Sequence, residues 1–174
     1  MDRAAMAAEQ WARERPELDT GPMVLLGRLG EAALLIARDR INPLFADFGL
    51  QPGEFDVLAT LRRSGTPYAL TPTALYEAAM ISSGSMTNRI DRLESAGLVE
   101  RRANPADKRG TLVALTSEGL ALIDRAVEAR SVRRAGRDEN HVANLQSIVS
   151  GLDEQERDQL AGLLGKLIRL QLLK

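Results

Sequence analysis

The sequence predicts a mainly α-helical chain with one small β-hairpin, arranged as a winged helix-turn-helix. Apolar residues recur at three- and four-residue steps along most of the 174 residues, which is the pattern of amphipathic helices. One stretch departs from this pattern, because Leu98–Arg102 and Thr111–Leu115 are short β-prone runs that flank a polar loop, Ala103–Gly110. A short helix, a capped second helix and then a hairpin are the elements of that fold class, in their usual order.

The N-terminal part predicts two helices. An alanine-rich segment, Met6–Arg15, forms the first and ends before a proline. Pro22 suits the first turn of the second, whose apolar residues continue over Met23–Phe48. Pro43 lies inside this second helix and is expected to kink it.

Three more helices are expected before the hairpin, at Pro52–Arg63, Thr73–Ala79 and Gly84–Ala96. Thr71 is a good N-cap for the short middle one, because a proline follows it at the first helical position. Ser82 or Ser83 can cap the third helix, and Gly97 ends it. This third helix has the position of a recognition helix, which enters the major groove of DNA in such folds.

Long helices follow the hairpin. Thr116 is expected to cap the first of them, and an acidic capping box, Asp153–Glu156, to begin the last. Between them Ala129–Gln146 is predicted to be an insertion or a divergent segment, with its arginine-rich part, Arg130–Arg137, a solvated linker. We expect three regions: an N-terminal extension and dimerisation helix at 1–48, a winged helix-turn-helix at 49–116, and C-terminal dimerisation helices at 117–174.

Composition argues against catalysis. The chain has no cysteine and one histidine, His141, so a thiolate nucleophile, a cysteine zinc site, a multi-histidine metal centre and a Ser–His relay are all disfavoured. We therefore expect no enzymatic activity, no cofactor and no metal. Carboxylates such as Asp91 and Glu94 are expected to pair with neighbouring arginines. Apolar runs fall short of the roughly 20 residues that a membrane helix needs, and the N-terminus has no secretory pattern. The expected location is the cytoplasm, without a membrane partner.

The densest motif runs from Ile81 to Arg101. It opens with small polar residues and continues as T-N-R-I-D-R-L-E-S-A-G-L-V-E-R. A D-K-R-G wing follows at Asp107–Gly110, and L-T-S-E-G at Leu115–Gly119 leads into the next helix. This combination resembles the MarR family of bacterial transcription regulators, from Met23 to about Ala126 and less tightly from Asp153 to Leu173. The resemblance implies a homodimer that binds a palindromic DNA operator.

Seven residues are candidate DNA contacts: Ser83, Ser85, Thr87, Asn88, Arg92, Lys108 and Arg109. The short serine side chains let the recognition helix approach the groove closely. Thr87, Asn88 and Arg92 carry donors and acceptors for base edges, since asparagine suits adenine and arginine suits guanine. Arg109 at the hairpin tip can enter a narrow A·T-rich minor groove, with Asp107 holding it or the wing in place, while Lys108 contacts phosphate.

A narrower resemblance concerns the N-terminus. Trp11–Asp19, followed by Gly21-Pro22-Met23, resembles the N-terminal extension of the PecS/HucR/TamR branch of the family. The branch implies an effector site made by Trp11, Asp56, Arg63, Arg89 and Arg101. Asp56 and Arg63 are seven residues apart and share a helix face. Arginines supply bidentate donors, so the expected effector is an anion packed on Trp11, such as urate, another purine or a tricarboxylate.

Apolar faces at both ends of the chain are expected to meet a twofold mate. They comprise Leu26 and Leu29 of the early helix with Leu163, Leu167 and Leu170 of the last one. The leading hypothesis is therefore a ligand-responsive regulator, a repressor released by a small anionic effector. Two alternatives stay open: a constitutive or architectural DNA-binding protein without an effector, and a helical module that binds a protein partner.

Overall fold

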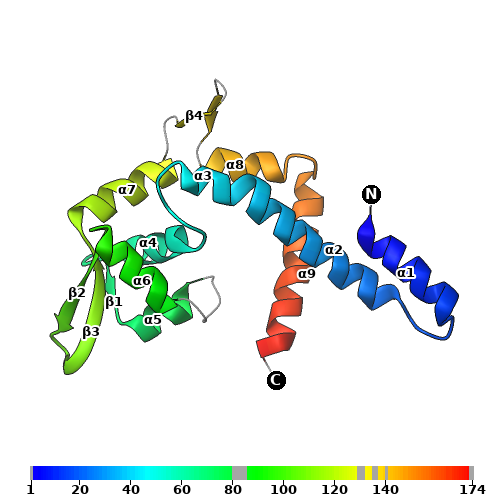
Figure 1. The fold of residues 1–174 in the computed structure, drawn as a ribbon, viewed down its shortest axis with the longest axis horizontal. Helices are drawn as coiled ribbons and strands as arrows, with labels where there is room; N and C mark the ends of the chain where they lie inside the picture. The colour runs from blue at the N-terminus through cyan, green and yellow to red at the C-terminus, as the bar shows by residue number, and fades with distance from the viewer. Residues whose placement is uncertain (1, 80–85, 129–131, 135–136, 140, 173–174) are drawn as a thin grey trace. The chain divides into compact units, whose positions relative to one another are not determined.

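The computed structural model describes residues 2–79, 86–128, 132–134, 137–139 and 141–172, and Figure 1 shows their course. The chain divides into two compact units, Met1–Pro52 and Gly53–Lys174. The first contains α1 (Arg3–Glu14), α2 (Gly21–Ile36), the π-helical turn η1 (Ala37–Ile41) and α3 (Asn42–Ala46). Within the described residues, the helices fall short of the length and apolar character that a membrane crossing requires.

The first predicted helix is confirmed as α1, which packs on α2. Its N-cap is Asp2, whose carboxylate accepts a hydrogen bond from the Ala5 N–H at 3.0 Å and pairs with Arg28 of α2 at 2.7 Å. The two helices approach closely at Gly27, where an added Cβ would lie 2.8 Å from the Cβ of Ala4. One carboxylate thus caps α1 and ties it to α2.

The predicted helix Met23–Phe48 is present as three consecutive segments, α2, η1 and α3. Pro43 carries no N–H and its ring crowds the preceding turn, so regular α-helical bonding fails next to it. The chain widens there into a π turn, in which the Asn42 N–H donates to the Ala37 carbonyl. The expected effect of Pro43 therefore takes the form of a π turn.

The second unit carries α4 (Glu54–Arg63), β1 (Ala69–Leu70), α5 (Pro72–Ala78), α6 (Met86–Ser95), β2 (Val99–Asn104), β3 (Asp107–Leu115) and α7 (Ser117–Glu128). The strands form an antiparallel sheet in the order β1-β3-β2, and α4 packs against α5, α6 and α7. Its core consists of fully buried side chains, among them Leu58, Leu61, Leu75, Leu93, Val113 and Ile123. Thr71 caps α5 as predicted, its hydroxyl accepting from the Ala74 N–H at 3.1 Å. The predicted caps Ser82 and Ser83 lie outside the described residues.

The predicted long loop at the hairpin tip, Ala103–Gly110, is wrong. Regular strand pairing reaches Ala103 opposite Thr111. The register then shifts, so that Asn104 pairs with Asp107, residues 108–110 form an irregular stretch of β3, and Pro105 and Ala106 remain at the turn. The Asn104 side chain closes that turn by accepting the Ala106 N–H at 3.0 Å. The wing is therefore a two-stranded ribbon over most of its length.

The C-terminal part contains β4 (Val132–Arg134), β5 (Arg137–Glu139), α8 (His141–Ile148) and α9 (Glu154–Leu172). The expected linker at Arg130–Arg137 contains strand residues instead, because β4 and β5 pair as antiparallel strands, and its solvation stays a prediction. The capping box of α9 is confirmed: Asp153 accepts the Glu156 N–H at 2.8 Å, and Glu156 accepts the Asp153 N–H at 2.9 Å.

Candidate functional site

The outer face of α6 presents polar side chains. Thr87 and Asn88 are exposed, whereas Met86, Ile90 and Leu93 are buried and fix the helix on the core. The predicted contacts Ser83 and Ser85 lie outside the described residues. The predicted contacts Lys108 and Arg109 belong to the start of β3, next to the wing tip, and their side chains lie outside the description.

Arg92, also on α6, is joined to α4. Its Nε donates a hydrogen bond of 2.8 Å to Oε1 of Glu54, the first residue of α4. The Glu54 side chain is only 6% exposed, while that of Arg92 is 50% exposed. The sequence prediction included Arg92 and missed Glu54. An acid at the start of a helix is ordinarily explained by the helix dipole, so Glu54 gave no separate signal.

A second arginine of α6 lies over the residue before Glu54. Gly53 has φ +81°, and a Cβ added there would come within 2.6 Å of Arg89 Nε. The Nη1 atom of Arg89 is buried and finds no hydrogen-bond acceptor within the described part of the chain. A buried donor without a partner costs about 1–3 kcal/mol, so this atom is a place where an acceptor would bind.

Asp56 interacts electrostatically with Arg89 and Arg63. Burial raises the pKa of the Asp56 carboxyl, and the positive charges of Arg89 and Arg63 oppose that rise without cancelling it. Arg63, at the end of α4, also donates to the carbonyl oxygen of Ala78. The structure therefore brings together three of the five predicted effector residues.

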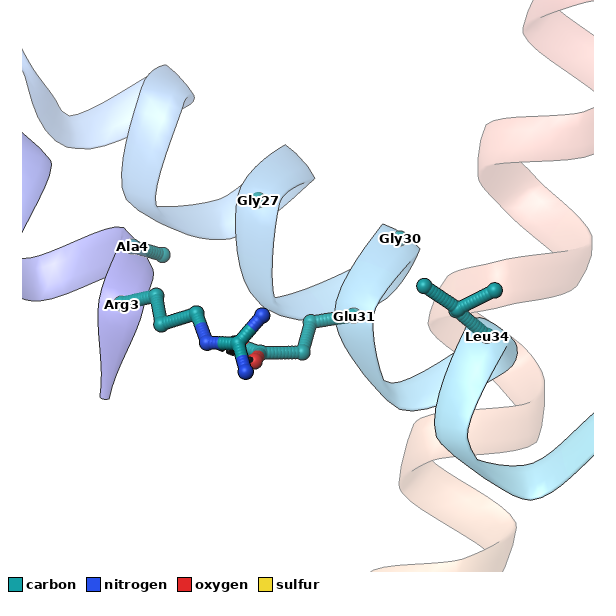
Figure 2. Close-up of a pocket in the computed structure, with 6 residues that line it drawn as sticks. All are labelled: Arg3, Ala4, Gly27, Gly30, Glu31 and Leu34. Carbon is teal, nitrogen blue, oxygen red and sulfur yellow. Dashed lines mark ion pairs between the residues drawn. The ribbon is translucent and has the colours of Figure 1, made fainter. Parts of the chain in front are cut away.

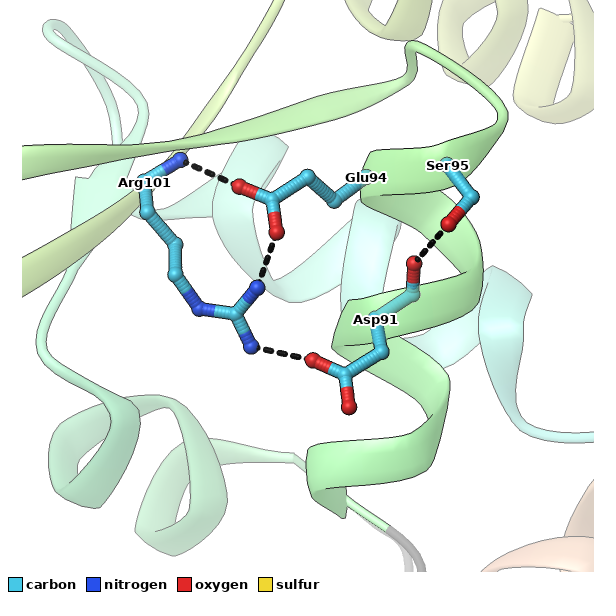
Figure 3. A network of polar contacts seen from close by, with 4 residues as sticks. All are labelled: Asp91, Glu94, Ser95 and Arg101. Carbon is cyan, nitrogen blue, oxygen red and sulfur yellow. Dashed lines mark hydrogen bonds and ion pairs between the residues drawn. The ribbon is translucent and has the colours of Figure 1, made fainter.

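Arg101, the fourth predicted effector residue, is held by two carboxylates of α6 (Figure 3). Its guanidinium pairs with Asp91 and Glu94, and its backbone N–H donates to Glu94 Oε1 at 3.1 Å. The hydrogen bond that the Arg101 guanidinium donates to Asp91 is the main cause of the raised pKa of Arg101. The expectation that Asp91 and Glu94 pair with a neighbouring arginine is confirmed. Arg101 thus links the first wing strand to α6.

Trp11, the fifth, belongs to α1 in the first unit, and its side chain is 48% exposed. A shallow hollow of about 300 Å³ lies between α1 and α2, lined by Arg3, Ala4, Gly27, Gly30, Glu31 and Leu34 (Figure 2). Trp11 does not line this hollow. Arg3 pairs with Glu31 across it at 3.3 Å, so the local charges neutralise each other and do not favour an anion.

The raised pKa of Asp56 predicts a pH-dependent effect of Asp56→Asn. Ionisation of Asp56 costs more in the folded chain than in the unfolded one. The aspartate therefore lowers stability once the pH exceeds 3.8, the ordinary pKa of its carboxyl group. The variant should be more stable than the wild type at pH 7, and this advantage should vanish below about pH 4. Thermal unfolding between pH 3 and pH 8 measures the difference.

Asp39→Asn is the matched control, because a hydrogen bond from Arg38 lowers the pKa of Asp39. Relative to the wild type, Asp39→Asn should become less stable as the pH rises, which is the opposite of the change expected for Asp56→Asn. An Asp56→Asn advantage that is the same at every pH would contradict the assigned cause.

Comparison with known proteins decides the family. A sequence model described as the MarR family matches residues 48–110, which run from the end of the first unit to the wing. Over 158 residues the chain is 42% identical to the HTH-type transcriptional regulator PecS of Dickeya dadantii, an alignment that covers 91% of this chain and 88% of PecS. The chain belongs to the MarR family. The resemblance predicted from the sequence is thereby confirmed.

Solved structures of MarR-family proteins share the fold. A mutant MarR from Escherichia coli complexed with operator DNA superimposes with a TM-score of 0.68 at 27% identity, covering 90% of this chain and 96% of that one. BpsR of Bordetella bronchiseptica, whose DNA binding is regulated by 6-hydroxynicotinic acid, gives 0.62 at 27% identity, covering 82% of this chain and 89% of BpsR. In this MarR-family regulator, α5 and α6 are the helix-turn-helix and β2 and β3 the wing.

Proposed function

We propose that this MarR-family regulator is a repressor that binds a palindromic operator as a homodimer and is released by a small anionic effector. One observation carries the effector part of the proposal. Arg89 Nη1, on the DNA-reading helix, is buried beside the half-buried Asp56 without an acceptor in the described chain. An anion oxygen at this atom would change the surroundings of α6 directly, which couples ligand binding to DNA binding.

The proposed DNA interface is the exposed side of α6 and the wing. Thr87, Asn88 and Arg92 lie on α6 and suit base edges, with Ser83 and Ser85 just before them in the chain. Lys108 and Arg109 adjoin the wing tip and suit phosphate and the minor groove. The similarity to a MarR structure complexed with operator DNA supports this assignment.

The proposed effector site has Asp56, Arg63 and Arg89 at its centre, completed by Trp11 and Arg101. Two arginines around one carboxylate leave a net positive charge, which favours an anionic ligand. Urate, another purine and a tricarboxylate all supply planar or carboxylate acceptors. BpsR, a structural neighbour, responds to an aromatic carboxylate, 6-hydroxynicotinic acid, which fits the same chemistry.

The proposed dimer buries the apolar faces of α2 and α9. Leu26, Leu163 and Leu170 are 57%, 59% and 51% exposed in the single chain, a large apolar surface for a protein of this size. Leu29 and Leu167 extend the same faces. A twofold dimer would hold two α6 helices for half-sites about one DNA turn apart. Sedimentation should show a dimer at micromolar concentration, and a stable monomer would contradict the assignment.

Substitutions in the two parts of the proposed DNA interface should have different effects on base preference and binding affinity. Asn88→Ala should change the preferred base pair in the major groove, by about 1–3 kcal/mol. Arg109→Ala should weaken binding mainly to sites with A·T pairs under the wing. Affinities for an operator and its single-base variants measure both effects. Arg15→Ala, an exposed arginine of the first unit, is the control and should change neither. Equal losses on every duplex would mean that Asn88 and Arg109 contact only phosphates.

A further inference from the structure

Two arginines of α6, Arg89 and Arg92, contact the same turn of α4. Arg89 covers Gly53, and Arg92 donates to Glu54, the next residue. Arg89 and Arg92 are three positions apart and so share one side of α6. The start of α4 is thus the surface against which the recognition helix is set.

We propose that Glu54 is a positioning residue that sets the base preference of α6 by fixing the side chain of Arg92. The inference rests on the proposed placement of α6 in the major groove. Glu54 itself does not reach DNA in this account, because its side chain is only 6% exposed. It acts on recognition through the orientation of Arg92.

The chemistry of the contact supports this role. A guanidinium is planar, so a hydrogen bond at Nε restricts the orientation of the whole group. Within the described residues Arg92 donates through Nε, and half of its side chain is exposed. Its two terminal nitrogens are the donors that contact guanine bidentately. A side chain fixed before binding loses less conformational entropy when it meets the base, which sharpens discrimination against other bases.

The burial of Glu54 also argues for a specific role. A buried carboxylate requires a partner, and the start of a helix favours its negative charge. One of its partners, Arg92, is on the helix that the family places in the major groove. An ion pair whose arginine is half exposed contributes little to stability, so loss of the contact should affect recognition more than folding.

The experiment selects bound duplexes from a randomised library and then measures affinities for the consensus and each single-base variant. Five proteins are compared: the wild type, Glu54→Gln, Glu54→Leu, Arg92→Lys and the double variant that combines Glu54→Leu with Arg92→Lys. Glutamine keeps an acceptor oxygen for Arg92 Nε, whereas leucine fills similar space without one. Lysine retains the positive charge but removes the planar group. Thermal unfolding of each protein reports the structural cost separately.

Glu54→Leu should reduce discrimination at one base pair of each half-site about tenfold, with discrimination elsewhere unchanged. Arg92→Lys should reduce it at the same base pair, and Glu54→Gln should retain most of it. Combining Glu54→Leu with Arg92→Lys should add little to either single change.

A Glu54→Leu protein that melts at a lower temperature but keeps the wild-type base preference would overturn the inference and leave Glu54 a structural residue. Equal affinity losses on all duplexes would overturn it as well. If the wild type itself enriches no sequence, the proposed function fails together with the inference. The two failures are therefore distinguishable.

Discussion

Gly119→Ala is expected to lower the free energy of unfolding by about 3 kcal/mol, because the new methyl group has no space. A Cβ at Gly119 would lie 1.9 Å from the carbonyl oxygen of Leu98, a backbone atom. That carbonyl accepts the Thr116 N–H at 3.2 Å, and the Thr116 hydroxyl caps α7 by accepting the Gly119 N–H at 3.0 Å. Accommodating the methyl group therefore requires β2 and α7 to separate where the wing begins.

Chemical or thermal unfolding at fixed protein concentration measures this effect. Gly162→Ala in α9 is the control, since a Cβ there meets no atom within 4 Å. Alanine favours a helix over glycine by about 1 kcal/mol, so the control should be as stable as the wild type or more so. A Gly119→Ala protein with wild-type stability would mean that α7 and the wing are not joined this closely.

Local features of this fold could be predicted from the sequence because their causes are local. Thr71 and the pair Asp153 and Glu156 satisfy backbone groups within three residues of themselves, so their capping roles follow from order along the chain. Thr116 was recognised in the same way. The shared helix face of Asp56 and Arg63 followed from their spacing.

Tertiary features could not be predicted in that way. At the polar tip of the wing the register shifts and Asn104 pairs with Asp107, an arrangement that residue propensities alone do not indicate. Glu54 is distinguished from an ordinary helix-start acid only by its burial and by its bond to Arg92, 38 positions away in sequence. The buried Nη1 of Arg89 likewise follows from packing. Recognition of the family supplied the candidate residues, and the geometry supplied their partners.

Arg89→Ala is expected to impair both activities at once, with operator affinity falling about tenfold, or about 1.4 kcal/mol. In the wild type, Arg89 covers Gly53, and its positive charge lowers the pKa of Asp56. In the variant, α6 loses this contact with α4, and Asp56 loses a neutralising charge. It also removes the proposed anion donor. Operator binding with and without added anion measures both losses.

Arg63→Ala is the matched control for Arg89→Ala. Arg63 influences Asp56 from within α4 and does not belong to the DNA-reading helix. The Arg63 variant should therefore keep operator affinity while its response to the anion weakens. Similar effects of the two variants on operator affinity would contradict a coupling role specific to Arg89.

We propose that one anion both occupies the site and releases DNA, and the only tryptophan of the chain, Trp11, allows a direct test. Urate, trans-aconitate and 6-hydroxynicotinic acid are titrated separately, while intrinsic fluorescence and operator release are followed. For at least one anion, fluorescence should change over the concentrations that release the operator, apart from the shift set by DNA linkage. If all three anions leave both the fluorescence and the operator complex unchanged, the effector site is wrong and the chain is a constitutive DNA-binding regulator.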